Sequence, residues 1–517
     1  MFEQHSGRVS GRVPSPESVA RLDDLLERRH PSVTAVSAGL VERICAATRA
    51  ENRAAAAQLV AIGELFGYRL SRCRDTEDWA VDTEEALAAE VAAALRISQG
   101  LAAGRLRYAR AMRERLPLVG AVFAAGDIDM RTFQTIVFRT DLITDREVLA
   151  GVDAQLAAHV TRWPSMTRAR LGAQIDRIVE RVDADAVRAR KERHADREVW
   201  LTDLDGGTSM ITGSLVTSDA HALDRRLSAL AATVCPDDPR TRQQRRADAL
   251  GVLAAGGDRL GCRCGRSECA AAQCPAPGAM VIHVLAEQAG IAGRAMAPAS
   301  QVSADGLIPA ELVAELSASA KLVPLIHPGD APPEEGYVPS KALADFVRCR
   351  DLTCRWPGCD RPAFDCDLDH TIPYADGGPT HASNLKCYCR THHLVKTFWG
   401  WRDQQLPDGT LILTSPSGQT YVTTPGSALL FPSLCQATGS IAAPEVDTPA
   451  DHCGQRTAMM PKRPKTRAQN RAHRITTERH RNRDSRVTRH RARTYASSAD
   501  WINSTSPGPP DDDPPPF

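Results

Sequence analysis

The chain has 517 residues, which excludes one ordinary hydrophobic core and predicts two or three domains with linkers. Hydrophobic residues make up 42%, charged residues 25% and aromatic residues 5%, so we expect a soluble globular protein with cores of Ala, Leu, Val and Ile. The net charge of +1 hides an asymmetry, because residues 456–493 hold fourteen Lys or Arg and two acidic residues, a net +12, and the rest sums to −11.

The first residues show no apolar stretch and no small-residue cleavage site, so we expect no signal peptide. The longest uncharged apolar stretch, residues 116–126, is about half as long as a membrane-spanning helix. We therefore predict a cytoplasmic protein that does not contact a membrane. Its fifteen cysteines then favour metal ligation over disulfides, because the cytosol keeps thiols reduced.

Residues 1–32 are polar and predicted to be flexible, and from about Val33 to Val182 the sequence predicts successive Ala-rich helices. The first apolar stripe follows Asp82 and Glu85, a possible capping box, and the second follows Asp129 as N-cap. The three stripes are Leu87, Val91, Leu95 and Ser98; Met130, Phe133, Ile136 and Val137; and Leu171, Ile175, Ile178 and Val182.

After Arg197 the pattern alternates between apolar and polar residues, which predicts a β-hairpin around Asp205-Gly206-Gly207. A helix over residues 219–232, a strand from Met280 and a helix near Pro309 then predict a small α+β portion. Residues 33–328 are thus predicted to form a mainly helical domain with a small α+β portion. The Pro- and Gly-rich residues 329–336 are the predicted linker to the second half.

The last part of the chain divides into a hairpin and a tail. Turns at Asp408-Gly409 and Ser417-Gly418 predict short strands that pack as a flap on a domain of residues 337–430. Residues 439–517 lack hydrophobic periodicity and end in Pro and Asp, so we predict a disordered tail. Its basic part either tracks DNA phosphates, with steep salt dependence, or is a solvated arm; we favour DNA.

Two pairs of zinc-ligand residues stand in the second half. Cys354 and Cys359 form a C-x4-C pair, and about thirty residues later Cys389 and His392 form a C-x2-H pair. Together they supply the four ligands of a tetrahedral structural Zn²⁺, which contributes on the order of 10 kcal/mol to folding a small module. Cys366 and Cys387 are left over, either as core thiols or as a replacement for one ligand.

Four further polar residues are not needed by this zinc. Asp369 and His393 supply an oxygen and an imidazole nitrogen, which suit one divalent ion such as Mg²⁺ or Mn²⁺ that keeps waters and open positions. His370 has an ordinary pKa of about 6.5 and can accept a proton from the attacking water. Asn384 either completes the metal shell or fixes the backbone near His370.

These residues resemble the HNH, or ββα-metal, endonucleases, through Asp369-His370, Asn384 and the run from Cys389 to Lys396. The resemblance implies His370 as general base, Asp369 and His393 as metal ligands, Asn384 as the middle letter of the motif and Lys396 as a phosphate contact. It also implies two antiparallel strands and a helix around the ion.

A wider resemblance, to the 13E12-repeat family of HNH proteins, covers about residues 35 to 425. It rests on LAAGRLRYARAMRERLP, GDIDMRTFQTIV, the Gly336-Tyr337-Val338-Pro339-Ser340 stretch and PDGTLILTSPSG. It implies a helical domain of unknown function followed by an HNH domain. That helical domain would position the nuclease, form homo-oligomers or bind a protein partner.

A second cysteine group is spaced C-x-C-x4-C-x4-C. It offers four thiolates for another zinc, or it is a Cys-rich surface loop whose thiols share no ligand. The tight C-x-C start strains a tetrahedral site unless the backbone turns sharply. Its members are Cys262, Cys264, Cys269 and Cys274.

The leading hypothesis is an HNH endonuclease that hydrolyses DNA phosphodiester bonds. The competing hypothesis is a zinc-dependent DNA-binding or regulatory protein that keeps the scaffold without cutting. The intact set Asp369, His370, Asn384 and His393 favours the first.

Overall fold

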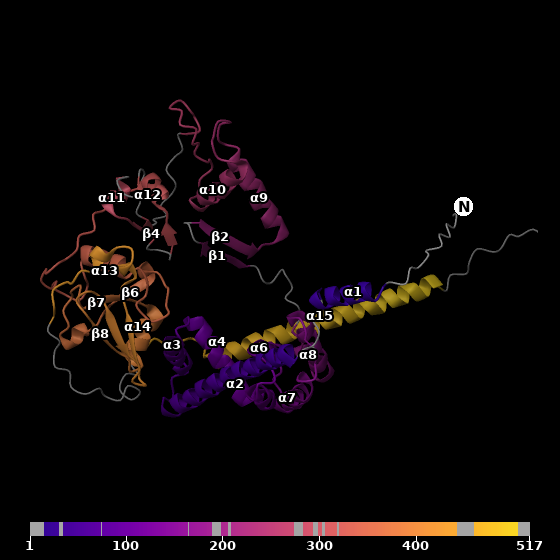
Figure 1. The fold of residues 1–517 in the computed structure, drawn as a ribbon. Helices are drawn as coiled ribbons and strands as arrows, with labels where there is room; N and C mark the ends of the chain where they lie inside the picture. Colours follow the sequence, from indigo (N-terminus) through magenta and orange to yellow (C-terminus); the bar gives the residue numbers. More distant parts are fainter. Residues whose placement is uncertain are drawn as a thin grey trace, which may run out of the picture.

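The structure is a computed structural model. It describes residues 15–29, 35–73, 75–163, 165–188, 198–204, 208–272, 283–292, 298–301, 306–317, 320–441 and 460–504. Figure 1 shows a helical region from the first part of the chain, a strand-containing region from the second half beside it, and smaller sheets and helices from the middle of the chain. The observed arrangement, a mainly helical first part with small antiparallel sheets, agrees with the prediction.

Eight α-helices and one π-helical turn build the helical region. Asp82 accepts a hydrogen bond from Glu85 N before α3, and Asp129 accepts one from Thr132 N before α6, so both residues are N-caps as predicted. The side chain of Glu85 bonds Gln99 and Arg467, so only half of the predicted capping box is seen. The helices are α1 Pro16–Arg29, α2 Ala35–Arg72, α3 Thr83–Leu95, α4 Gln99–Arg110, α5 Pro117–Ala125, α6 Met130–Arg139, α7 Arg146–Val160 and α8 Arg168–Val182, with the π turn at Ala111–Arg115.

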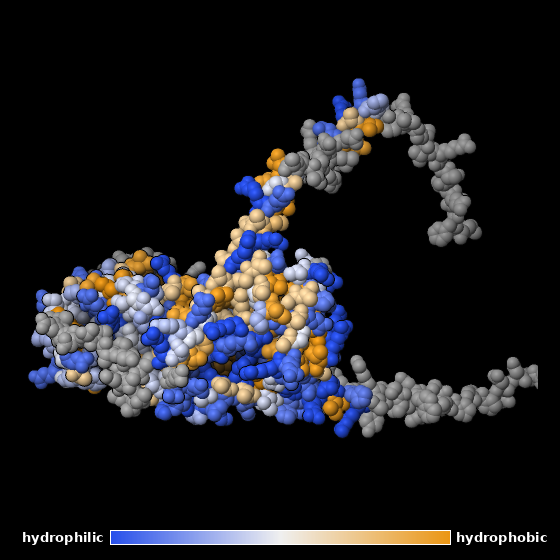
Figure 2. Space-filling model, turned by 90° about the horizontal axis from the view of Figure 1, so that it is seen from below, coloured by the Kyte–Doolittle hydropathy of each residue, from blue (hydrophilic) through white to orange (hydrophobic). Residues whose placement is uncertain are grey.

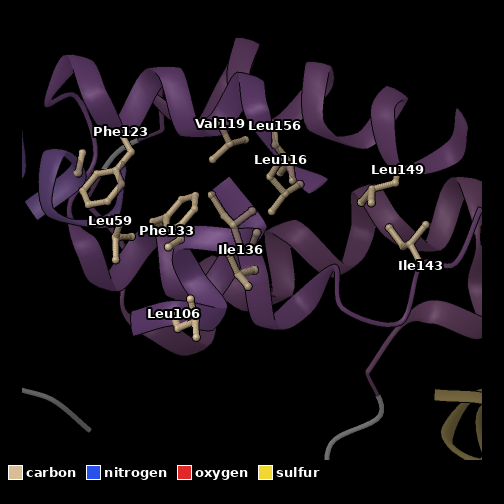
Figure 3. Packing of buried hydrophobic residues seen from close by; sticks show 14 of the residues in the cluster. Leu59, Leu106, Leu116, Val119, Phe123, Phe133, Ile136, Ile143, Leu149 and Leu156 are labelled. Carbon is tan, nitrogen blue, oxygen red and sulfur yellow. The ribbon is translucent and has the colours of Figure 1, made fainter. Parts of the chain in front are cut away.

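The core of this region is aliphatic, as the low aromatic content predicts, with one stacked ring pair. Phe123 and Phe133 lie 5.1 Å apart between ring centroids. Figure 3 shows them among Leu59, Leu116 and Ile136, all of which are fully buried. Because α4, α5, α6 and α7 each contribute to this cluster, the helices pack around one core.

The middle of the chain forms two small antiparallel sheets with helices. Strands β1 and β2 pair as the predicted hairpin, whose turn at 205–207 lies outside the described residues, and α9 matches the predicted helix. The elements are β1 Glu198–Leu204, β2 Thr208–Ser214, α9 Thr217–Ala231, α10 Arg242–Ala254, β3 Val284–Leu285, α11 Gln288–Ile291, β4 Ala299–Gln301, β5 Gly306–Ile308 and α12 Ala310–Ser317.

The second half contains two more antiparallel sheets. Strands β6 and β7 pair with Asp369 opposite Lys386, and α14 follows β7 directly. The predicted flap is a three-stranded sheet in the order β10-β9-β8, with the two predicted turns between its strands. The elements are α13 Lys341–Asp351, β6 Cys366–His370, β7 Leu385–Cys389, α14 Arg390–Phe398, β8 Arg402–Gln405, β9 Leu411–Thr414 and β10 Thr420–Thr423.

The helical region and the second half share a hydrophobic cluster. Trp79 packs edge to face on Trp399, with ring centroids 5.8 Å apart, and Trp399 donates its indole N–H to Val81 O at 3.1 Å. Ala89 and Ala93 of α3 belong to the same cluster as the residues of β7 and α14. The two regions therefore bury apolar surface against each other.

The prediction of a disordered tail is wrong for residues 467–504, which form the helix α15, Arg467–Ser504. Ile475 inserts into the core of the helical region, and Arg467, Arg471 and Arg479 pair with acidic residues of that region. Hydrophobic periodicity gives no sign of α15, because the helix has no continuous apolar stripe and is held by Ile475 and by ion pairs with residues far away in the chain.

Figure 2 shows apolar side chains on an arm that projects from the molecule, and the side chains in the first half of α2 are mostly exposed. Val36, Leu40, Val41 and Ile44 are exposed there. No single helix among the described residues is long and apolar enough to cross a membrane.

Candidate functional site

Three cysteines and one histidine converge beside β7. Their ligand atoms all lie within 4.8 Å of one another. Cys389 caps α14 and His392 lies in its first turn, while Cys354 and Cys359 lie in the loop after α13. The set, Cys354, Cys359, Cys389 and His392, is the one predicted from the spacing, and its soft sulfur and borderline nitrogen donors can hold a metal ion such as zinc.

The histidine of this cluster is oriented by its neighbours. His392 Nδ1 lies 3.3 Å from Cys389 Sγ and 3.5 Å from Cys354 Sγ, so this nitrogen is the one that faces a metal. Trp356 stacks on the imidazole, with ring centroids 4.7 Å apart and planes 1° from parallel. The opposite nitrogen, Nε2, faces Gln99 Oε1 of the helical region at 3.4 Å.

The two leftover cysteines of this segment are core thiols, the first of the two alternatives. Cys366 donates its thiol to Pro362 O at 3.3 Å, and Cys387 is fully buried within the shared cluster. Burial raises the pKa of Cys387 well above its ordinary value, which keeps that thiol protonated. Elsewhere the expectation against disulfides fails at Cys73, which is disulfide-bonded.

A polar site lies next to the cysteine cluster, on β6 and α14. Asp369 Oδ1 lies 3.3 Å from His393 Nε2, and His393 Nδ1 lies 2.8 Å from Asp367 Oδ2. Alternate residues of a strand share a face, which is why Asp367 and Asp369 both reach His393. A carboxylate behind an imidazole orients the ring and raises its basicity, as it does for metal-bound histidines.

Two lysines neutralise the other side of Asp369. Lys386 Nζ lies 2.8 Å and Lys396 Nζ 2.9 Å from Asp369 Oδ2, so Oδ1 alone is left facing His393. Burial by itself would raise the pKa of Asp369, but the two ammonium groups and His393 hold it well below its usual range. Asp369 is therefore ionised at neutral pH.

The resemblance implied a phosphate contact for Lys396, and the structure places that side chain differently. Lys396 Nζ donates to His370 O at 2.7 Å as well as to Asp369, and only 11% of the side chain is exposed. The ammonium group thus points into the protein and ties α14 to the end of β6. These contacts give Lys396 a structural role that the resemblance did not imply.

His370 ends β6 and is buried. Its Nε2 lies 3.0 Å from Thr380 Oγ1, and that hydroxyl donates its single proton to Gly336 O at 2.6 Å. Nε2 must then be the nitrogen that donates to Thr380, which leaves the lone pair of the neutral ring on Nδ1. Tyr337 stacks on the imidazole at 5.3 Å, and burial lowers the pKa of His370.

The carboxamide of Asn384 bonds the backbone of the neighbouring loop and not Asp369 or His393. Its Oδ1 accepts from Ile372 N at 2.8 Å, and its Nδ2 donates to Ile372 O at 3.0 Å and Pro379 O at 2.9 Å. Of the two roles left open, the structure shows the second, because Asn384 fixes the loop that follows His370. This loop also holds Thr380, the partner of His370.

The second cysteine group includes a cysteine that was not predicted to belong to it. Cys235, at the end of the α9 segment, joins Cys262, Cys264 and Cys269, and the four sulfur atoms lie within 4.8 Å of one another. The predicted fourth residue, Cys274, lies outside the described residues. Cys235 is not part of the closely spaced group in the sequence, because it lies 27 residues before Cys262. The packing of α9 on α10 brings the two segments together.

A family model and several curated relatives match the chain. The model of a domain of unknown function, DUF222, matches residues 46–351. The chain belongs to this family. It is 44% identical over 485 residues to the uncharacterized protein Rv3776 of Mycobacterium tuberculosis, covering 89% of this chain and 92% of that one.

A second relative from Mycobacterium tuberculosis, the uncharacterized protein Rv2100, is 42% identical over 509 residues, which cover 90% of this chain and 89% of the relative. A shorter match to the uncharacterized protein Rv1128c is 34% identical over 64 residues. No solved structure matches the chain. The DUF222 match ends at Asp351, whose carboxylate is buried against the second half, so the family domain extends into the shared packing.

Proposed function

We propose that the second half of the chain is an HNH endonuclease module that hydrolyses DNA phosphodiester bonds with a divalent metal ion. The observation that carries the proposal is the approach of Asp369 Oδ1 and His393 Nε2 to 3.3 Å, with His370 next to Asp369. The order of strand, strand and helix in β6, β7 and α14 supports it, because this is the order that the resemblance implies.

The donors at this point fit a hard divalent cation such as Mg²⁺ or Mn²⁺. Asp369 offers one oxygen, since lysines occupy the other, and His393 offers Nε2 once its Nδ1–H donates to Asp367. Two protein ligands suit an ion that retains several waters. When bound, the ion would polarise a phosphate and stabilise the leaving oxygen.

His370 is the proposed general base. The Thr380 hydroxyl oxygen accepts a hydrogen bond from Nε2–H, so the Nδ1 lone pair is free to accept a proton from water. The lowered pKa keeps the ring neutral, and therefore competent as a base, near pH 7. Asn384 and Tyr337 are positioning residues. Asn384 fixes the loop after His370, Tyr337 stacks on the imidazole, and neither accepts the proton.

We propose that the basic C-terminal segment contacts DNA through the face of α15 that points away from the helical region. Arg463, Arg467, Arg471, Arg474, Arg479 and Arg486 are paired with acidic residues of that region. Arg481, Arg483 and Arg491 are exposed. Charges on that exposed face would neutralise phosphates, and binding would weaken steeply with salt.

A non-cleaving, zinc-dependent DNA-binding protein is the second candidate, and one observation favours it. Lys386 and Lys396 already neutralise Asp369, as they would in a scaffold that holds no catalytic ion. In that case the cysteine cluster would stabilise a binding module, and DNA would be held without hydrolysis.

A plasmid-nicking assay with Mg²⁺ or Mn²⁺ separates the two candidates. We expect nicking by the wild-type chain and its loss in His370→Ala at equal zinc content, while His159→Ala, on the exposed end of α7, cuts like the wild type. Equal nicking by the wild type and His370→Ala would exclude His370 as the general base. A wild type that shifts DNA mobility without nicking, together with unchanged binding by His393→Ala, would establish the second candidate.

A further inference from the structure

Four thiols in the middle of the chain meet although they come from two separate segments. Cys235 follows α9, and the other three lie in the loop after α10. The Cys235 and Cys262 sulfur atoms are 3.4 Å apart, whereas a disulfide bond is about 2.05 Å long. All four are free, partly buried thiols: Cys235, Cys262, Cys264 and Cys269.

We propose that these four residues bind a second Zn²⁺, as a tetrathiolate structural site separate from the nuclease module. Their sulfur atoms lie within 4.8 Å of one another, as ligands of one tetrahedral ion do. Zinc with four protein ligands has no open position for water or substrate. This site is therefore structural and does not depend on whether the chain cuts DNA.

Contacts other than the thiols bring the two segments together. Asp238, which follows Cys235 closely, accepts hydrogen bonds from Arg240 and from Arg263 N, and Arg240 also donates to Gly261 O. Thr233 Oγ1 accepts from Leu260 N at 2.9 Å. Because these bonds fix the backbone on both sides of the cysteines, the convergence of the sulfur atoms is built into the fold.

The sharp backbone turn that the C-x-C spacing requires is present. Gly265, directly after Cys264, has φ of +74°, a conformation that favours glycine over other residues. Cys269 N then donates to Arg266 O, and Cys262 N donates to Ala271 O, which closes the loop on itself. Cys262, Cys264 and Cys269 can thus face one point.

The hydrophobic core around this site is small, so a bound zinc ion would be needed to stabilise the fold. The hydrophobic cluster of α9 and α10 contains only three buried residues, Leu227, Leu230 and Ala249, among the residues described. Units with so little buried apolar surface usually need a metal or a disulfide to stay folded. A structural zinc contributes on the order of 10 kcal/mol to such a unit.

Zinc content per chain, measured on the full-length protein by elemental analysis and native mass spectrometry, tests the proposal. We expect two zinc ions in the wild type, one in Cys235→Ser and two in Cys235→His, because an imidazole can replace a thiolate. Cys359→Ser, which breaks the other cluster, should also lose one ion. Cys45→Ser, at an exposed cysteine outside both clusters, is the matched control and should keep two.

Two results would overturn the proposal: one zinc ion in the wild type with none in Cys359→Ser, or two ions retained in Cys235→Ser. Cys274→Ser tests the ligand set, because it should keep two ions if Cys235 is the fourth ligand. Loss of an ion in Cys274→Ser, with two ions kept in Cys235→Ser, would mean that Cys274 and not Cys235 is the fourth ligand. None of these readouts involves DNA cleavage, so a failure of the nuclease proposal leaves them unaffected.

Discussion

Gln99, at the start of α4, places its side-chain oxygen 3.4 Å from Nε2 of His392, a proposed zinc ligand of the second half. The carboxamide is oriented by its own Nε2, which donates to the backbone oxygen of Glu85 at 3.1 Å and to its carboxylate at 3.0 Å. The DUF222 region thus supplies an outer partner to a proposed metal ligand 293 residues away in sequence.

Gln99→Ala should therefore release zinc from the Cys354 cluster more readily. Loss of a hydrogen bond to the outer nitrogen of a metal-bound histidine typically costs about 10- to 100-fold in metal affinity. Zinc transfer to a colorimetric chelator measures the effect. Gln58→Ala is the matched control, since Gln58 bonds Arg105 within the helical region; equal release from the two variants would refute a role for Gln99.

His392→Cys adds a second control to this experiment. A cysteine at this position would keep four zinc ligands but remove the nitrogen that Gln99 contacts. In this background Gln99→Ala should leave zinc release unchanged. An equally large effect in both backgrounds would mean that Gln99 acts only through the packing of α4.

Asp351→Asn should destabilise the chain, because Asp351 is a buried carboxylate between two arginines. It accepts from Arg350 Nε at 2.8 Å, from Arg355 Nη1 at 3.0 Å and from Cys387 N at 2.8 Å. Removing one partner of a buried ion network costs about 3 to 5 kcal/mol. Urea unfolding at pH 7 measures this loss.

The same variant predicts a pH dependence. Burial would raise the pKa of Asp351, but Arg350 and Arg355 outweigh it and lower the pKa. A carboxyl group with a lowered folded-state pKa stabilises the fold above its unfolded pKa of about 3.9, and this stability is lost as the pH falls through the folded pKa. The difference in unfolding free energy between wild type and Asp351→Asn should shrink below about pH 4; a constant difference would contradict the assignment.

Asn384→Ala should loosen the loop after His370 without removing zinc. The variant leaves the partly buried N–H and C=O of Ile372 and C=O of Pro379 without this partner, which lowers the free energy of unfolding by about 2 to 4 kcal/mol in total. Hydrogen exchange at the Ile372 amide should accelerate, while zinc content stays the same. Unchanged exchange with weaker Mg²⁺ binding would instead make Asn384 a metal ligand.

Ile475→Ala should weaken the docking of α15 on the helical region. Ile475 is buried in the core of that region, and an Ile→Ala change at such a site costs about 2 to 5 kcal/mol. Limited proteolysis should cleave the C-terminal segment faster in this variant, and more so at high salt, which screens the partly exposed pairs of Arg471 and Arg474 with Asp141. Val487→Ala, on the exposed side of α15, should behave like the wild type.

Local patterns predicted the elements well where one helix or hairpin determines the answer. Asp82 and Asp129 cap helices as their spacing to the next apolar residues indicated, and β1 and β2 pair as the alternation indicated. Asp367 was missed in the candidate site, although its position two residues before Asp369 on a strand was a usable signal. Lys386 gave no comparable signal, because its partner Asp369 lies across the strand pair.

The amino-acid sequence alone predicted the cluster of Cys354, Cys359, Cys389 and His392, because the members of each pair are only a few residues apart and the two pairs follow the spacing of zinc ligands. Only the tertiary structure decided that Cys235 completes the second cysteine cluster, that Lys396 points inward and that α15 is ordered. Each of these depends on a partner far away in the chain. Hydrophobic periodicity and motif spacing describe neighbours in sequence, whereas ion pairs and sulfur clusters form between segments that packing brings together.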